Sequence, residues 1–191
     1  SANTMIESRD GTVGRLFPGV SYRIEKIDGV AEGGKLLVKG PNIMKGYLNP
    51  EPNEAFQKLD GWYDTGDIVT VDEDRYITIL GRAKRFAKIS GEMVSLSAVE
   101  AAVRAVVDDP NIPLMAVSLP DANKGERIVL LSEAALDAQT LKTALRSHGT
   151  PALMIPSDWL TVEEIPRLGS GKADFAGAKR LAEAQLAAES S

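Results

Sequence analysis

The chain has 191 residues, 43% hydrophobic and 26% charged, a composition that fits one ordinary folded domain or two small ones and excludes a disordered chain. The net charge of -5 gives no general attraction to nucleic acid, so no nucleic-acid partner is expected. The absence of cysteine excludes disulfides, thiolate metal sites and a cysteine nucleophile.

The sequence also bears on the setting of the protein. A single histidine, His148, excludes a site built from several histidines, and we expect the chain itself to hold no metal. No apolar run approaches the ~20 residues that span a bilayer, and no signal-peptide pattern opens the chain. Because the chain begins Ser1-Ala2-Asn3 without methionine, we expect an excised piece of a longer protein. The lack of cysteine and of a signal-peptide pattern fits a reducing, cytoplasmic setting.

The first half contains short apolar stretches separated by turn residues, a pattern typical of β-strands. Asp28-Gly29 is a turn signal after the first stretch, and Asp72-Glu73-Asp74 lies between the last two, which we predict to pair as a hairpin. Strands are predicted over residues 20–27, 35–39, 67–71 and 76–80. This half is therefore expected to be mostly β.

From about residue 83 the pattern changes to alternating helices and strands. Ser97-Ala98-Val99-Glu100 predicts a capping box, in which the serine accepts from the third helical N–H and the glutamate reaches back. The helix that follows is amphipathic, with apolar residues at i, i+3, i+4 and i+7, namely Val99, Ala102, Val103 and Val106. Apolar runs over residues 114–119 and 127–131 predict two strands.

Two more helices are predicted in this half. Asp137 is expected to cap one, which ends with the cations Arg146 and His148 followed by Gly149. A third, alanine-rich helix is expected after Lys172. The predicted fold is therefore α+β: a small β-rich subdomain over residues 1–82, then a C-terminal α+β domain over residues 83–191.

Three stretches carry candidate chemistry. The first, Gly-Gly-Lys-Leu-Leu-Val-Lys-Gly at residues 33–40, runs on to Met-Lys-Gly-Tyr at 44–47 and, taken alone, indicates only a strand between glycine turns. In the second, residues 61–67, a Thr-Gly turn sets Asp67 to present two oxygens to the vicinal hydroxyls of a ribose. Arg82 follows the returning strand and can reach the same sugar. Alternatively, Asp67 only caps a turn and Arg82 is a solvated surface residue.

The third stretch is Ile-Pro-Arg-Leu-Gly-Ser-Gly-Lys at residues 165–172. Its glycines allow close approach to a ligand, and the Lys172 ammonium can face developing negative charge on a carboxylate or phosphate. The P-loop spacing fails, because Pro166 occupies the first glycine position and Ala173 follows the lysine. The alternative is an exposed lysine in a loop that enters a helix.

Together these stretches resemble the adenylate-forming superfamily, which includes acyl-CoA synthetases, luciferases and nonribosomal-peptide adenylation domains. The matching motifs occur in the family's order over roughly residues 11–175. They are Gly-x-Leu-x-Val-x-Gly at 34–40 with Gly46-Tyr47, Tyr63-x-Thr65-Gly66-Asp67, Gly81-Arg82-x-Lys84 with Lys88-Ile89-x-Gly91, and Pro166 with Gly171-Lys172.

The resemblance implies ATP as cosubstrate and a role for each matching residue. Asp67 would hold the ribose of ATP with help from Arg82, and Lys84 would be the hinge of a C-terminal lid domain. Gly91 would lie in the loop that faces a pantetheine thiol. Lys172 would be the catalytic lysine between the substrate carboxylate and the α-phosphate. The phosphate-binding loop and the Mg²⁺ ligand are expected upstream of residue 1.

A narrower resemblance rests on residues 81–96, 39–44 and 168–172. These resemble the part of bifunctional 2-acylglycerophosphoethanolamine acyltransferases that attaches acyl groups to acyl carrier protein. It implies a fatty acid substrate, acyl carrier protein as partner, and a lysophospholipid that binds an acyltransferase domain outside this chain. It also implies that the full-length protein associates with the cytoplasmic face of a bacterial inner membrane.

Several positions depart from the family pattern. Asp64, Leu96, Ala98 and residues 173–175 do so without removing a catalytic group. Met93 stands where a basic residue is frequent, which disfavours the phosphates of coenzyme A. A basic cluster is a candidate surface for steering an acidic carrier protein, although such clusters are often only solvated: Arg82, Lys84, Arg85 and Lys88. An acyl-CoA synthetase fragment and a non-catalytic module that docks carrier protein remain as alternatives.

Overall fold

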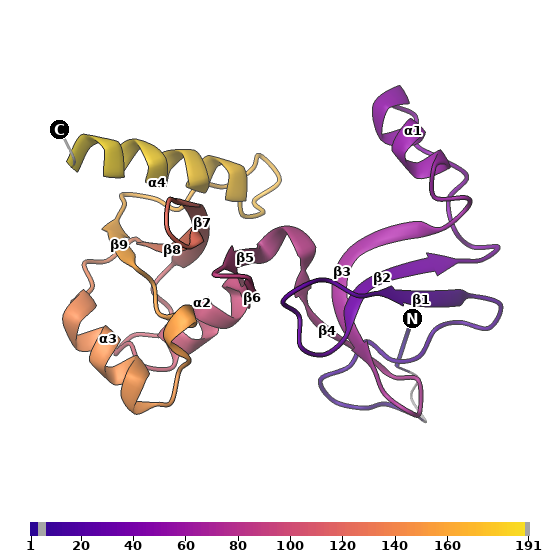
Figure 1. Ribbon diagram of the computed structural model, residues 1–191, viewed down its shortest axis with the longest axis horizontal. Coiled ribbons are helices and arrows are strands. Elements are labelled where there is room, and N and C mark those ends of the chain that lie inside the picture. Colours follow the sequence, from indigo (N-terminus) through magenta and orange to yellow (C-terminus); the bar gives the residue numbers. More distant parts are fainter. Residues whose placement is uncertain (4–6, 190–191) are drawn as a thin grey trace. The chain divides into compact units, whose positions relative to one another are not determined.

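The computed structural model describes residues 1–3 and 7–189, and the chain divides into two compact units (Figure 1). The first unit comprises Ser1–Lys84 and the second Arg85–Ser191. Both combine strands with helices, and neighbouring strands pair antiparallel except at one edge of the second sheet. The predicted α+β class is confirmed.

The first unit is built on a four-stranded antiparallel sheet in the order β1-β2-β3-β4. Leu36 and Val69 lie with Val38 and Ile77 in its buried core. The two predicted strands before residue 40 and the predicted hairpin are confirmed. The elements are β1 (Ser21–Glu25), β2 (Gly34–Lys39), α1 (Pro50–Gln57), β3 (Tyr63–Val71) and β4 (Ile77–Arg82).

Helix α1 was not predicted, and its sequence explains why. It begins with proline at the first position, and Asn49 makes no capping bond through its side chain. It buries only Phe56, whose ring meets the ring of Tyr47 edge to face at 6.0 Å. One buried residue in eight produces no apolar period that a sequence pattern could reveal.

The second unit contains a five-stranded sheet in the order β6-β5-β8-β7, with β9 pairing parallel to β8. The short β5–β6 hairpin and β9 were not predicted. The elements are the 3-10 turn η1 (Ala83–Arg85), β5 (Phe86–Ile89), β6 (Glu92–Ser95), α2 (Leu96–Arg104), β7 (Leu114–Asp121), β8 (Gly125–Ser132), α3 (Ala138–Ser147), η2 (Ala152–Met154), β9 (Asp158–Thr161) and α4 (Phe175–Glu189).

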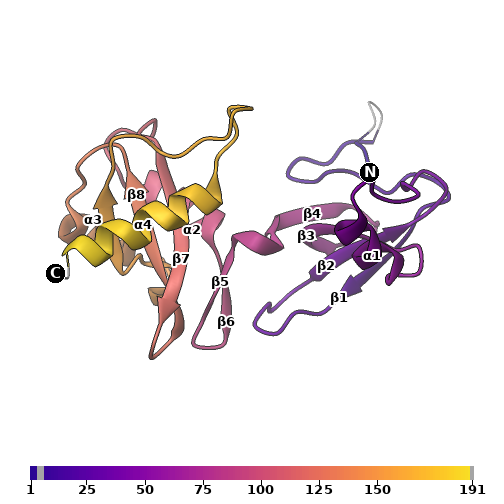
Figure 2. The ribbon, with the colours of Figure 1, turned by 90° about the horizontal axis from the view of Figure 1, so that it is seen from above.

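Helices cover both faces of this second sheet, with α4 on one side and α2 and α3 on the other (Figures 1 and 2). Side chains of a strand alternate between faces, so Leu114 and Ala116 pack with Val99 and Leu145, while Met115 and Val117 pack with Ala178 and Ala182. Burial on both faces explains why β7 and β8 have continuous apolar sequences rather than alternating ones.

The structure shows which residues cap the starts of α2 and α3, for which the sequence predicted Ser97 and Asp137. Asp137 caps α3 as predicted, accepting from the backbone N–H groups of Gln139 and Thr140, and α3 ends at Ser147, with His148 as its C-cap and Gly149 after it. The predicted capping box of α2 is wrong. The cap is Ser95, whose hydroxyl accepts from the Ala98 N–H, because α2 begins at Leu96, earlier than the Ser97 box requires.

Candidate functional site

The turn that carries Asp67 is held by hydrogen bonds within β2 and β3. The Thr65 hydroxyl donates to the carbonyl of Leu36 at 2.9 Å and accepts from the Asp67 N–H at 3.1 Å. The Asp64 carboxylate accepts from the Gly66 N–H at 2.9 Å. Gly66 has φ of +72°, which favours glycine. These bonds fix the backbone from which the Asp67 side chain projects.

Asp67 and Arg82 are partners across the β3–β4 pair. Arg82 Nε lies 3.0 Å from Asp67 Oδ1, and Arg82 Nη1 donates to the Thr65 carbonyl at 3.0 Å. The side chain of Asp67 is 16% exposed and that of Arg82 is 66% exposed. The structure thus joins the two residues that the sequence assigned to one sugar, as an ion pair at the open edge of a hairpin.

Asp67 retains capacity to accept hydrogen bonds. The Arg82 Nε is at ion-pair distance but not aligned for a hydrogen bond, so Asp67 Oδ1 is buried without a donor among the described residues. The rest of the carboxylate is partly exposed and can accept a hydrogen bond from a ligand hydroxyl. The pair therefore fits a group with donor hydroxyls, as a ribose has.

Tyr63 is a site residue that the sequence reasoning did not single out. Burial raises the pKa of its phenol, and the Tyr47 phenol raises it further. The charge of Arg82 lowers the same pKa and that of Asp67 raises it. Its position at the start of Tyr-x-Thr-Gly-Asp was the available signal.

Asp64, which departs from the family pattern, has a structural role. It pairs with Lys35 at 3.0 Å, and Lys35 also pairs with Glu25 at 3.2 Å. The hydrogen bond to Asp64 is the main cause that raises the pKa of Lys35, with Glu25 adding to it. Asp64 therefore holds the strands and the Gly66 turn together beside Asp67.

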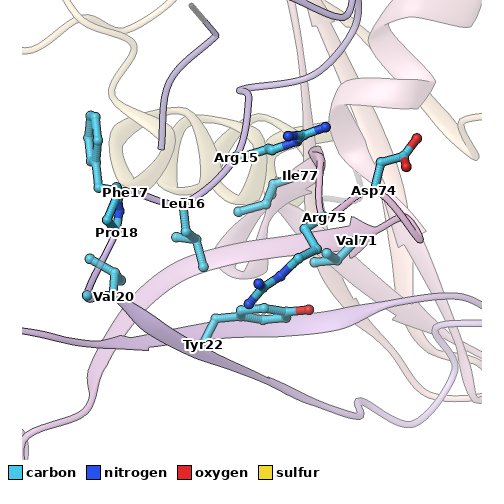
Figure 3. Close-up of a pocket in the computed structure, with 11 residues that line it drawn as sticks. Arg15, Leu16, Phe17, Pro18, Val20, Tyr22, Val71, Asp74, Arg75 and Ile77 are labelled. Atoms are coloured by element: carbon cyan, nitrogen blue, oxygen red, sulfur yellow. The ribbon is translucent and has the colours of Figure 1, made fainter. Parts of the chain in front are cut away.

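Two of the cavities formed by described residues of the first unit bear on the position of the site. One of about 190 Å³ has Asp67 and Thr65 in its lining, with apolar side chains such as Leu36 and Ile43 around them. The other, of about 330 Å³, lies between residues 15–20 and the side chains of Tyr22, Val71 and Ile77 (Figure 3). None of the predicted site residues lines this second cavity, so we place the candidate site at Asp67.

Two neighbouring cations at the predicted hinge differ in exposure. Lys84 is exposed in the turn η1, whereas Arg85 is 6% exposed. Arg85 donates to the Ala116 carbonyl at 2.7 Å and is paired with Glu100. The predicted basic cluster is therefore wrong in one member, because the charge of Arg85 is neutralised inside the second unit and is not available to a partner.

Gly91 lies in a two-residue turn between β5 and β6. Ser90 has φ of 52° and Gly91 has φ of 91°, the combination of a type I′ hairpin turn. The Ser90 N–H donates to the Lys124 carbonyl at 2.8 Å, and a Cβ added at Gly91 would meet no atom within 4 Å. The tip of this hairpin is thus open on the Gly91 side.

Lys172 closes an exposed loop before α4. The Leu168 N–H donates to the Lys172 carbonyl at 2.8 Å, the Gly171 N–H donates to the Leu168 carbonyl at 2.8 Å, and Gly171 has φ of 79°. The Lys172 ammonium makes no hydrogen bond or ion pair within residues 1–3 and 7–189. The loop therefore presents a lysine that is free to meet an anionic ligand.

The structure thus distributes the predicted site residues over both units. Asp67, Arg82 and Lys84 belong to the first unit, and Gly91 and Lys172 to the second. Within the described part of the chain, no three acidic or histidine side chains group as a metal ion would require. None of the described helices combines the length and apolar character needed to cross a membrane.

Relatives identify the family. Acyl-CoA synthetase 7 of Caenorhabditis elegans is 35% identical over 176 residues, which cover 86% of this chain and 32% of that protein. The 2,3-dihydroxybenzoate-AMP ligase of Bacillus subtilis is 39% identical over 147 residues, covering 74% and 26%. The chain belongs to the adenylate-forming superfamily. No protein-family model matches it.

A solved structure agrees with this assignment. The o-succinylbenzoate CoA synthetase MenE of Bacillus subtilis, in complex with the acyl-adenylate OSB-AMP, matches with a TM-score of 0.70 and 26% identity. The match covers 88% of this adenylate-forming chain and 35% of MenE. The chain spans about a third of the length of such superfamily members and has the fold of their C-terminal part.

Proposed function

We propose that this chain is the C-terminal part of an ATP-dependent acid–thiol ligase. A carboxylate oxygen attacks the α-phosphorus of ATP, giving an acyl adenylate and pyrophosphate. A phosphopantetheine thiol then attacks the acyl carbonyl, loses its proton, and releases AMP. The observation that carries the proposal is the Asp67–Arg82 pair with its partly exposed carboxylate, in a chain similar to a protein named as an AMP ligase.

The first unit would bind the nucleotide. Asp67 accepts hydrogen bonds from the ribose hydroxyls, and Arg82, anchored at the Thr65 carbonyl, orients that carboxylate. ATP itself supplies the adenylyl group and the pyrophosphate leaving group. The phosphate-binding loop and the Mg²⁺ ligand would come from sequence outside this chain.

The second unit would change the chemistry between the two steps. Carboxylate attack brings two anions together, and the Lys172 ammonium stabilises the charge that develops, an effect worth roughly 3–4 kcal/mol for comparable preorganised groups. The thiol must then reach the same carbonyl, so Lys172 has to withdraw. Rotation of the second unit about Lys84 would bring the open hairpin tip at Gly91 toward the thiol instead.

For the substrates, we propose a fatty acid as the acyl donor and acyl carrier protein as the acceptor, with a lysophospholipid served by an acyltransferase domain outside this chain. The motif at residues 81–96 supports this choice, as does Met93, an uncharged side chain in β6 where a basic residue is frequent in the family. The full-length protein would then act at the cytoplasmic face of a bacterial inner membrane.

Coenzyme A is the second candidate acceptor, favoured by the similarity to proteins named as an acyl-CoA synthetase and a CoA synthetase. Steady-state kcat/KM for coenzyme A and for holo carrier protein, measured on the full-length protein, distinguishes the two. A higher value for carrier protein that falls with added salt is expected if exposed Lys84 and Lys88 attract an acidic partner. A preference for coenzyme A contradicts the first choice.

The role of Lys172 is tested in the full-length protein by separating the two steps. Lys172→Ala should reduce ATP–pyrophosphate exchange by about a hundredfold or more and spare thioester formation from supplied acyl adenylate. Lys58→Ala, which removes an exposed lysine after α1, is the matched control and should leave both steps intact. Equal loss of both steps in Lys172→Ala contradicts the assignment.

A further inference from the structure

Arg85 is the most constrained cation of the second unit. Its guanidinium donates to the Ala116 carbonyl at 2.7 Å and is paired with Glu100, and the same Glu100 oxygen accepts from the Ala116 N–H at 2.8 Å. Arginine suits this position because its planar fork reaches several acceptors at once. The three groups form a closed network that fixes the guanidinium in place.

An aromatic ring packs over this guanidinium. Arg85 Cζ lies 4.0 Å from the centroid of the Phe175 ring, within the range of a cation–π contact. The Arg85 side chain is 7% exposed, whereas Phe175 itself is 44% exposed. Phe175 therefore contacts a rigid, charged anchor while much of its own surface still faces solvent.

Phe175 is the first residue of α4 and directly follows the loop that carries Lys172. That loop is closed at its base, where Arg167 and Ala173 form a β-bridge and the Asp174 N–H donates to the Pro166 carbonyl at 2.9 Å. Residues 167–172 are all exposed. Phe175 thus lies three residues after Lys172, and its contact with Arg85 connects the loop to the segment that follows Lys84.

We propose that Arg85 and Phe175 form a positioning pair that sets where Lys172 stands relative to the strand after the hinge. The role for Lys172 rests on the proposed function, but the contact does not. An ammonium displaced by about 1 Å costs on the order of a hundredfold in rate when it must meet a transition state. Buried Ile165 holds the start of the loop on the domain, and the Arg85–Phe175 contact holds its end, so losing that contact should loosen both the position of the loop and its exposed internal bonds.

The first test uses the chain as it is and measures amide hydrogen exchange at Asp174 and Gly171. Phe175→Leu removes the π face and leaves an exposed apolar side chain, so exchange at these amides should rise about five- to tenfold. Phe175→Tyr keeps an aromatic face and should restore protection. Unchanged exchange in Phe175→Leu, or equal exchange in both variants, overturns the anchoring contact.

The second test measures both half-reactions in the full-length protein. Phe175→Leu should lower kcat of pyrophosphate exchange about tenfold with little change in KM for ATP, and Phe175→Tyr should restore it. Thioester formation from supplied acyl adenylate should be unaffected, because Lys172 acts only in the first step. Equal loss of both steps indicates a merely structural role and overturns the proposal.

Lys172→Ala, measured alongside, separates the two ideas. If it leaves pyrophosphate exchange intact, the proposed function fails and the positioning role fails with it. If it abolishes exchange while Phe175→Leu does not lower it, only the positioning role fails. The hydrogen-exchange result on the chain decides the contact in either case.

Discussion

Arg82 contacts one oxygen of Asp67 and one backbone carbonyl: its Nε lies 3.0 Å from Asp67 Oδ1, and its Nη1 donates to the Thr65 carbonyl. The guanidinium is therefore held by the same turn that fixes the Asp67 backbone. Because Arg82 is largely exposed and the Asp67 side chain is 16% exposed, a sugar hydroxyl can approach the accessible part of the carboxylate.

The first prediction concerns this carboxylate. In the full-length protein, Asp67→Asn should raise KM for ATP about ten- to a hundredfold, because a hydrogen bond to a charged group contributes roughly 1.5–3 kcal/mol. Asp60→Asn, which alters a fully exposed aspartate of the same unit, is the control and should leave KM unchanged. An Asp67→Asn enzyme with an unaltered KM for ATP would show that Asp67 is only a turn residue.

The second prediction concerns the start of α2. Ser95→Ala should lower the free energy of unfolding by about 1 kcal/mol, because the Ala98 N–H loses its acceptor. Ser97→Ala lies inside the helix and should change stability by less than about 0.5 kcal/mol. Urea unfolding of the two variants measures the difference, and a larger cost for Ser97→Ala would restore the capping box expected from the sequence.

Local patterns explain which elements were predicted. Asp137 and the β3–β4 hairpin depend on neighbours a few residues away, so their sequence carries the whole signal. The Ser-x-x-Glu pattern at Ser97 misled because Glu100 is used elsewhere: it binds Arg85 and the Ala116 N–H, which lies 16 residues along the chain. A long-range partner thus overrode a local motif.

The same distinction holds for the candidate site. Asp67 and Arg82 could be paired from the sequence because a hairpin brings the ends of its strands together. The burial of Arg85 could not be predicted, since it depends on a carbonyl of β7 and on the Phe175 ring of α4. The roles of Lys84 and Gly91 stay predictions, as does that of Lys172, which the proposed exchange assay tests.

The third prediction concerns the hairpin tip at Gly91. Gly91→Ala places a Cβ on a residue with φ of 91°, which should cost about 1–2 kcal/mol of stability. The cost is purely conformational, because no atom lies within 4 Å of the added Cβ. Gly169→Ala, also without neighbours but outside the left-handed region, is the control and should be nearly neutral. Equal unfolding midpoints for the two variants would contradict the turn type.

The last prediction concerns the pH dependence that Asp137 gives to α3. Its carboxylate accepts from the Thr140 hydroxyl and from the backbone N–H groups of Thr140 and Gln139, which together hold its pKa below the usual value. A carboxyl group with a lowered pKa in the folded state favours folding once it is ionised. That contribution is present above the unfolded pKa of about 3.9 and is lost as the pH falls through the folded pKa.

Asp137→Asn isolates this effect, because asparagine also caps helices but does not titrate. Asp74 and Asp121 also have lowered pKa values, so both proteins should lose stability in acid. From about pH 5 downward, however, the wild-type chain should lose more than the variant, and their unfolding free energies should converge. Parallel curves from neutral pH into acid would mean that the charge of Asp137 adds nothing to its cap, and that a neutral acceptor at this position holds the start of α3 equally well.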